Sequence, residues 1–322
     1  KKFDEALSIF KVMNDKSSMA KVMNSIAILY YKTQRFDEAL EYWLLAYNTA
    51  KEFDDKLKIS KYVNNIGIWY WKDYDYSKAI DYYNESLTIK EELGDTRNYG
   101  KTLHNIGKVY YDMGDFTSSI EYYNQSIELK QKLNDKKGLN TSLLDLGTAQ
   151  FYNTDYQSAL TNYKRTLAIS QSFNDIYDIS ERYQVVGMTF FNLANYDSAF
   201  HYLNMADSLF QAYEYSENRL TTLSWLAITA TKDGKKAKSK TYVKGFNALI
   251  DEMDPMNKDI ISLNWNMYQV QKVLGDKKSA KEYLENAYLE IKFRSKNIKE
   301  KANRNKYLSI KLHKDITAAW NN

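Results

Sequence analysis

The segment Asn65-Ile66-Gly67-Ile68-Trp69-Tyr70 decides the fold, because close versions of it recur at a fixed spacing of 40 residues. A small residue stands at the glycine position of every copy, at Ala27, Gly67, Gly107, Gly147, Gly187 and Ala227. A second small residue stands 12 positions after each of them, at Ala39, Ala79, Ser119, Ala159, Ala199 and Ser239. Two such positions per repeat predict two helices whose backbones approach closely where the small residues meet.

The spacing of apolar residues inside each repeat is helical. Val63, Ile66, Gly67 and Tyr70 follow the i, i+3, i+4, i+7 pattern that places side chains on one face of a helix. The chain has 11 glycines and a single proline, Pro255, so it has few of the residues that β-rich folds need at their turns. We therefore predict an all-α fold.

This pattern resembles the tetratricopeptide repeat, which has small residues at its eighth, twentieth and twenty-seventh positions and aromatic residues between them. The resemblance implies a right-handed α-solenoid of stacked helix-turn-helix repeats. The spacing is six residues longer than the usual repeat and is similar to that of bacterial peptide-sensing regulators and Pins-type scaffold proteins. Seven repeats are expected within residues 17–295, starting near residues 20, 60, 100, 140, 180, 220 and 261.

The two ends of the chain are expected to differ from the regular repeats. Residues 1–16 resemble the second helix of a truncated repeat, so we expect the chain to be a fragment of a longer protein. Residues 292–314 carry nine lysines and arginines against one glutamate. We expect a single basic helix from Ile298 to Trp320, within a capping segment at 296–322. A lead-in to a membrane span and a nucleic-acid contact stay open as alternatives for this helix.

The family resemblance also implies a concave groove lined by the first helix of each repeat. At the twelfth position of the repeat an aromatic residue recurs on this face, at Tyr31, Trp71, Tyr111, Phe151 and Phe191. These rings either pack between adjacent first helices or stay open as a platform for a bound chain. The sequence alone leaves both interpretations standing.

Polar residues beside this aromatic ladder are expected to form a cationic patch: Lys61, Asn64, Asn65, Lys101, His104, Asn105 and Lys108. Clustered lysines favour a carboxylate or an acidic side chain, and asparagine amides can pair with an extended backbone. Asn65 and Lys101 resemble part of the carboxylate clamp of chaperone-binding repeats, whereas Asn24, Ile28 and Asn105 depart from it. Farther along, the expected groove turns apolar, with Thr148, Gln184 and Met188 beside the ladder phenylalanines.

Signals for catalysis or metal binding are weak in this sequence. The three histidines lie far apart, there is no cysteine, and the glycines stand singly inside predicted helices. The pair Asp54-Asp55 falls at a predicted turn, where carboxylates cap helices. We expect a non-catalytic scaffold, without cofactor or metal, that binds a protein or peptide segment in its groove. The alternative is a ligand-sensing regulatory region of a longer bacterial signal-transduction protein.

Expectations about partners and compartment are limited. We expect no nucleic-acid partner for these residues, and a membrane only through a segment beyond them. Oligomeric state is open, and both a cytoplasmic and a periplasmic location are compatible with the absence of cysteine.

Overall fold

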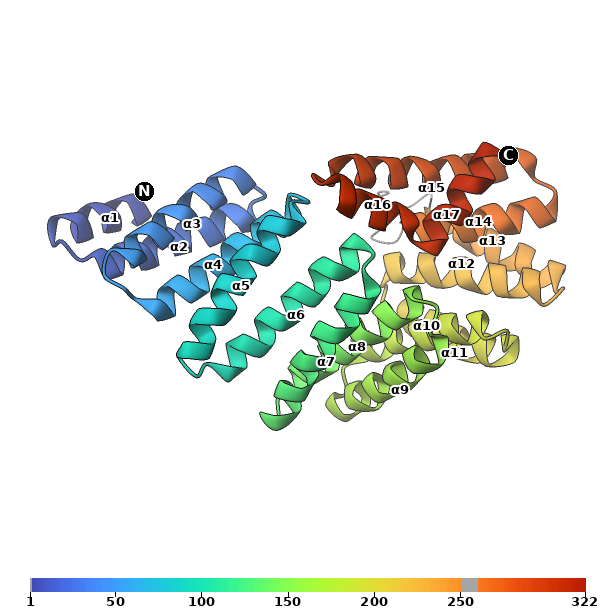
Figure 1. Ribbon diagram of the computed structural model, residues 1–322. Coiled ribbons are helices and arrows are strands. Elements are labelled where there is room, and N and C mark those ends of the chain that lie inside the picture. The colour runs from blue at the N-terminus through green and yellow to red at the C-terminus, as the bar shows by residue number, and fades with distance from the viewer. Residues whose placement is uncertain (1, 251–259) are drawn as a thin grey trace. The chain divides into compact units, whose positions relative to one another are not determined.

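The computed structural model describes residues 2–250 and 260–322, and over these residues the chain consists of helices without strands (Figure 1). Lys1 and the segment 251–259, which includes Pro255, lie outside the described residues. The all-α prediction is confirmed. The helices are α1 (Lys2–Val12), α2 (Lys16–Lys32), α3 (Phe36–Lys51), α4 (Lys56–Lys72), α5 (Tyr76–Glu92), α6 (Thr96–Met113), α7 (Phe116–Lys132), α8 (Lys136–Tyr152), α9 (Tyr156–Phe173), α10 (Ile176–Asn192), α11 (Tyr196–Ala212), α12 (Ser216–Lys232), α13 (Lys236–Ile250), α14 (Ile260–Leu274), α15 (Lys277–Asn297), α16 (Lys301–Ser309) and α17 (Lys311–Asn321).

Almost every joint between consecutive helices up to α13 has the same backbone geometry. A residue with positive φ ends each helix, and these residues recur at 20-residue steps from Asn14 to Gly234. An aspartate or asparagine follows at most joints and caps the next helix by accepting a hydrogen bond from the backbone amide three residues later. At the predicted capping pair, Asp54 has a φ of 52° and Asp55 accepts from the Lys58 amide at 3.0 Å. The predicted capping role is confirmed for Asp55, whereas Asp54 is the turn residue before it.

The predicted small residues lie where paired helices touch. A Cβ atom added at Gly107 would lie 2.7 Å from the Tyr123 ring, so no larger residue fits there without displacing this buried tyrosine. Ser119, from the second series, is fully buried and donates from Oγ to the Gly107 carbonyl at 2.8 Å. The close approach of the two helices in each repeat therefore depends on these positions.

The chain divides into two compact bodies, which we describe separately. The N-terminal body comprises Lys1–Asp135 with Asn297–Asn303, and the C-terminal body comprises Lys136–Lys296 with Arg304–Asn322. In the N-terminal body, α1 to α7 contact one another in chain order, and the first helices α4 and α6 also touch. Each helix pair therefore stacks on the next, as expected for a helical repeat.

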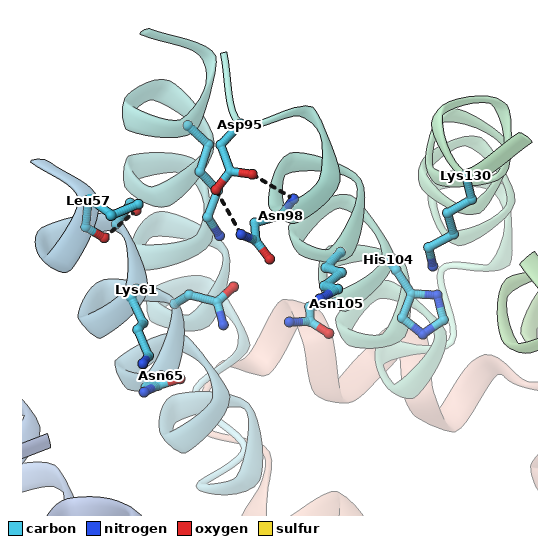
Figure 2. Close-up of a pocket in the computed structure, with 12 residues that line it drawn as sticks. Leu57, Lys61, Asn65, Asp95, Asn98, His104, Asn105 and Lys130 are labelled. Atoms are coloured by element: carbon cyan, nitrogen blue, oxygen red, sulfur yellow. Dashed lines mark hydrogen bonds between the residues drawn. The ribbon is translucent and has the colours of Figure 1, made fainter. Parts of the chain in front are cut away.

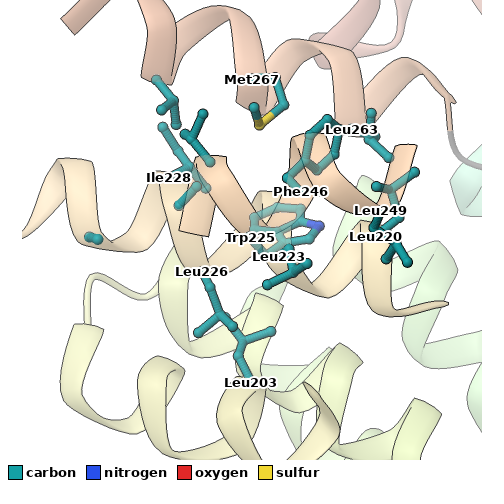
Figure 3. Packing of buried hydrophobic residues seen from close by; sticks show 14 of the residues in the cluster. Leu203, Leu220, Leu223, Trp225, Leu226, Ile228, Phe246, Leu249, Leu263 and Met267 are labelled. Carbon is teal, nitrogen blue, oxygen red and sulfur yellow. The ribbon is translucent and has the colours of Figure 1, made fainter. Parts of the chain in front are cut away.

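The C-terminal body has its largest apolar core around α12. Residues Leu220–Ala230 of this helix are all buried, because α10, α11, α13 and α14 contact it from different sides. Figure 3 shows Leu203, Phe246, Leu263 and Met267 converging on it. Because neighbouring helices cover α12 on all sides, apolar and small residues occupy every face of the helix near Trp225, and the helix has little amphipathic pattern.

The C-terminal stretch forms two short helices, so the prediction of a single helix from Ile298 to Trp320 is wrong. The backbone at Ile310 is extended, with φ −52° and ψ 132°, and it separates α16 from α17. At the break the Tyr307 carbonyl accepts from the Ile310 amide (3.3 Å) and from the His313 ring at Nδ1 (2.8 Å). α17 then packs against α15 through Trp320 and Tyr288, whose rings stack 5.1 Å apart.

Among the helices in residues 2–250 and 260–322, none combines the length and the apolar content that a membrane-spanning helix requires.

Candidate functional site

A cavity of about 560 Å³ opens in the N-terminal body between the first helices α4 and α6 (Figure 2). The ends of the second helices α5 and α7 supply part of its wall through Lys90 and Lys130. Six residues expected from the sequence line this cavity: Lys61, Asn64, Asn65, Lys101, His104 and Asn105. The other lining residues are Leu57, Ser60, Lys90, Asp95, Asn98 and Lys130.

Four lysines give the cavity its charge, and they differ sharply in exposure. Lys61 and Lys101 are exposed, whereas Lys90 and Lys130 are only 5% and 6% exposed. Lysine is rarely this buried unless a carboxylate pairs with it. The cavity therefore runs from an exposed cationic rim to a floor that contains two buried amines.

Lys90 has a single hydrogen-bond partner among the described side chains. Its Nζ donates to Thr102 Oγ1 at 2.6 Å, and within the described residues no carboxylate lies within ion-pair distance of it. Burial lowers the pKa of Lys90 to about 8, with Asp95 opposing this effect and Lys101 adding to it. The Lys90 ammonium group has three N–H donors and uses one of them on Thr102, so the others can bind a ligand in the cavity.

These two buried lysines were not predicted, although the repeat register contains the signal. Lys90 and Lys130 occupy the same position of successive repeats, and three other repeats have Ala50, Ser170 and Phe210 there, all fully buried. A charged residue at a position that is otherwise part of the core could have been found by reading the second helices across the repeats. The family resemblance implies a groove made by the first helices, whereas both lysines stand on second helices.

The asparagine amides predicted for the groove are partly used inside the protein. Thr102 Oγ1 donates to Asn64 Oδ1 at 3.0 Å, and Asn65 Nδ2 donates to Asn24 Oδ1 at 3.0 Å. Asn24 is buried and also accepts from Trp43 Nε1 at 3.2 Å. The position where the carboxylate clamp requires a basic residue is thus a structural hydrogen-bond acceptor here.

The ladder rings of the N-terminal body are half-buried and have neighbours. Tyr31 lies 5.5 Å from Phe36 between ring centroids, and Tyr111 lies 5.7 Å from Phe116. Trp71 donates from Nε1 to Asp112 Oδ2 at 2.7 Å. The Lys108 ammonium lies 4.5 Å from the Trp71 ring centroid, so this predicted groove lysine is held by a cation–π contact.

The predicted groove residues of the C-terminal body are mainly structural in their contacts. Phe151, Met188 and Phe191 are half-buried and pack against the core around α12, and Phe191 lies 5.3 Å from the Trp225 ring. Gln184 is buried, and its amide donates to the Asn218 carbonyl (2.9 Å) and to Thr222 Oγ1 (2.7 Å). Thr148 Oγ1 donates to the Leu144 carbonyl and accepts from Tyr163. The charged cavity and these residues therefore lie in different bodies.

Residues 2–250 and 260–322 contain no group of three or more His, Cys, Asp or Glu side chains placed to hold one ion.

Paired antiparallel helices of equal length, stacked in register and joined by identical turns, define a helical-repeat protein. Residues 18–92 and 98–172 match the family model of the tetratricopeptide repeat, and the protein is therefore a tetratricopeptide-repeat protein over these two stretches. The resemblance drawn from the small-residue register is thereby confirmed. A comparison with curated protein sequences gave no match.

Solved structures share this fold at low sequence identity. A Rap protein complexed with Competence and Sporulation Factor is 16% identical, with a TM-score of 0.57 over 99% of this chain and 98% of its own. A Rap conjugation gene regulator in complex with the Phr* peptide is 12% identical, with a TM-score of 0.63 over 90% and 78%. A signal-transduction ATPase with a tetratricopeptide repeat sensor, from Pyrococcus horikoshii, is 15% identical, with a TM-score of 0.68 over 85% and 42%. Such similarity establishes the fold, which is in general a non-catalytic scaffold for protein binding.

Proposed function

We propose that this protein is a non-catalytic scaffold that binds a peptide or protein segment along the face made by its first helices. The observation that carries the proposal is the cationic cavity between α4 and α6, which is concave and lined by the exposed Lys61 and Lys101 and by half-buried asparagines. Concave sites with a few convergent polar groups are the usual places where proteins hold a ligand. The partner is a protein or peptide segment with acidic character, and no nucleic acid or cofactor takes part.

The groove residues enter this proposal with different roles. Lys61, Lys101, His104 and Asn105 line the cavity and supply polar contacts. The rings of Tyr31, Trp71 and Tyr111 are half-buried, so each offers only its outer part to a bound chain. In the C-terminal body, Thr148, Phe151, Gln184, Met188 and Phe191 support the helices that present the surface.

The domain organisation expected from the sequence is part of the same proposal. Residues 1–16 form a half repeat, residues 17–295 form seven repeats, and residues 296–322 cap the array. Support comes from the paired helices α2–α3 to α12–α13, which contact each other within every pair.

The proposal is tested with charge-reversed variants and a library of random peptides. Peptides are selected on the purified wild-type chain, and their affinity is measured by fluorescence anisotropy. We expect Lys61→Glu with Lys101→Glu to weaken the selected peptides by at least about tenfold, which corresponds to about 1.4 kcal/mol. Both lysines are exposed, so the fold is retained, and circular dichroism checks this.

The matched control changes charge away from the cavity. Lys132 is exposed on α7 and pairs with Glu128, and Lys132→Glu together with Lys16→Glu gives the same net charge as the test variant. Unchanged peptide affinity in the test variant, or an equal loss in both variants, would contradict binding in the cavity. Added salt is expected to weaken binding to the wild type because exposed charges are screened.

A second candidate function is ligand sensing within a longer signalling protein. The fold similarity to an ATPase with a repeat sensor and to Rap regulators favours this alternative. Small-angle X-ray scattering with and without a selected peptide distinguishes the two: a change in radius of gyration supports sensing, and an unchanged curve supports a static scaffold.

A further inference from the structure

The charges around the cavity are unequal in number and kind. Four ammonium groups, from Lys61, Lys90, Lys101 and Lys130, face a single lining carboxylate, Asp95. Asp95 caps α6, and its two oxygens accept from the backbone amide of Asn98 (3.2 Å) and from the Asn98 side chain (2.7 Å), as Figure 2 shows. Its charge is therefore engaged at the helix start, and it makes no ion pair with Lys90.

The Lys90 amine stands where burial is costly, because Lys90 is only 5% exposed. Removing an ammonium group from water costs several kcal/mol unless an anion compensates it. Lys90 has no carboxylate within ion-pair distance in the described residues, and its other donors are free to bind a ligand. Ala50, Ser170 and Phe210 show that an uncharged residue fills the same position in other repeats. The lysines at 90 and 130 are therefore not required by the packing of the repeat.

The ligand that best compensates this arrangement carries more than one negative charge. A carboxylate brings one charge and two acceptor oxygens. A phosphate monoester brings a charge of about −1.5 to −2 near neutral pH and three acceptor oxygens, which suit several ammonium groups that converge from different helices. The cavity volume of about 560 Å³ is ample for a phosphate with the group that bears it.

We infer that the cavity between α4 and α6 binds a phosphate monoester, with Lys90 and Lys130 as the buried anion ligands and Lys61 and Lys101 at the rim. This inference rests on the proposed binding function and specifies the chemistry that the cavity recognises. The phosphate is either part of a phosphorylated peptide side chain or a free phosphate compound. Both sources share the same contact with the amines.

The experiment compares three small probes by isothermal titration calorimetry on the full chain: N-acetyl-O-phosphoserine amide, inorganic phosphate and N-acetylglutamate amide. We expect the phosphoserine probe to bind at least about tenfold more tightly than the glutamate probe. Tighter binding of phosphoserine than of inorganic phosphate identifies a phosphorylated peptide as the source. Equal binding of the two identifies free phosphate.

Variants then assign the binding to the buried amines. Lys90→Met and Lys130→Met each retain the length of the side chain, and each is expected to weaken the phosphoserine probe by at least about tenfold. Lys132→Met removes the same charge from an exposed position on α7 and is expected to change affinity less than about twofold. Circular dichroism and urea unfolding confirm that the variants are folded.

Three results would overturn the inference: equal affinity for the phosphoserine and glutamate probes, no binding of either phosphate compound, or an equal loss in Lys132→Met and Lys130→Met. These results are separable from failure of the scaffold function. Peptides that still bind the wild type and lose affinity in the Lys61 and Lys101 variant would show a groove that recognises carboxylates.

Discussion

Lys90→Met is expected to stabilise the free protein, although it removes a hydrogen bond. Lys90 is 5% exposed, and burial lowers its pKa from the ordinary value of 10.5 to about 8. At about 1.4 kcal/mol per pH unit, this difference makes the charged amine cost the folded state about 3 kcal/mol at neutral pH. Methionine has a similar length and no charge, so it removes this cost while filling the same space.

The lost hydrogen bond offsets part of the gain. Lys90 Nζ donates to Thr102 Oγ1, a contact worth about 1 kcal/mol. Thr102 retains its own bonds to Asn64 Oδ1 and to the Asn98 carbonyl, so its hydroxyl stays satisfied. The expected net effect is an increase of about 2 kcal/mol in the free energy of unfolding near pH 7.

The gain has a defined pH dependence. Between the folded pKa of about 8 and the unfolded value of 10.5, the unfolded chain binds the proton and the folded chain does not. Wild-type stability therefore rises with pH across this window, and the advantage of methionine fades. The titratable groups that line the cavity with Lys90 are Lys61, Asp95, Lys101, His104 and Lys130.

The assay is urea unfolding followed by circular dichroism, at about pH 7 and about pH 10, for the wild type, Lys90→Met and Lys132→Met. Lys132 is exposed and controls for the loss of one positive charge. A Lys90→Met protein that is no more stable than wild type at neutral pH refutes the reasoning. A gain of equal size at both pH values also refutes it.

Three further predictions concern other parts of the protein. The affinity for the phosphoserine probe is expected to fall as the pH rises through about 8, because Lys90 loses its proton there. Calorimetry across this range measures the affinity, and a constant affinity up to about pH 10 would speak against Lys90 as a ligand. Gly107→Ala is expected to lower the free energy of unfolding in urea by about 1–3 kcal/mol, because the new methyl group would lie 2.7 Å from the Tyr123 ring. In the control Gly100→Ala the methyl group lies 3.4 Å from Leu129, so this variant is expected to be neutral or stabilising, and equal effects of the two variants would disprove the packing argument. Burial lowers the pKa of His313 from 6.5 to about 4, so the free energy of unfolding is expected to fall by up to about 3 kcal/mol as the pH falls through this window. In acid unfolding, His313→Gln is expected to reduce this dependence of stability on pH, and an unchanged dependence would contradict the prediction.

The repeat architecture was predictable because its determinants are local and periodic. Gly67, Gly107 and their counterparts stand at helix contacts that admit only a small residue, so the register appears directly in the sequence. Asp55 and the other caps follow the same spacing. Such features depend on a few neighbouring residues and do not require knowledge of the whole molecule.

The candidate site was predictable only in part, because it combines residues from both helices of successive repeats. Lys61 and Lys101 lie on the first helices, where family resemblance directs attention, and both line the cavity. Lys90 and Lys130 lie on the second helices, and only the packed structure shows that their amines reach the same volume. The break at Ile310 was also not predicted, because the stripe of apolar residues continues through it, and only the structure shows the Tyr307 carbonyl accepting from the Ile310 amide and the His313 ring.

The uniform joints have a consequence for how such an array can change in length. The residue with positive φ recurs every 20 positions from Asn14 to Gly234, whatever its side chain, and the helices on either side are almost equal in length. Unequal recombination between any two repeats would regenerate an intact joint at the crossover point. Genes of this kind can therefore gain or lose whole repeats without redesigning a single turn.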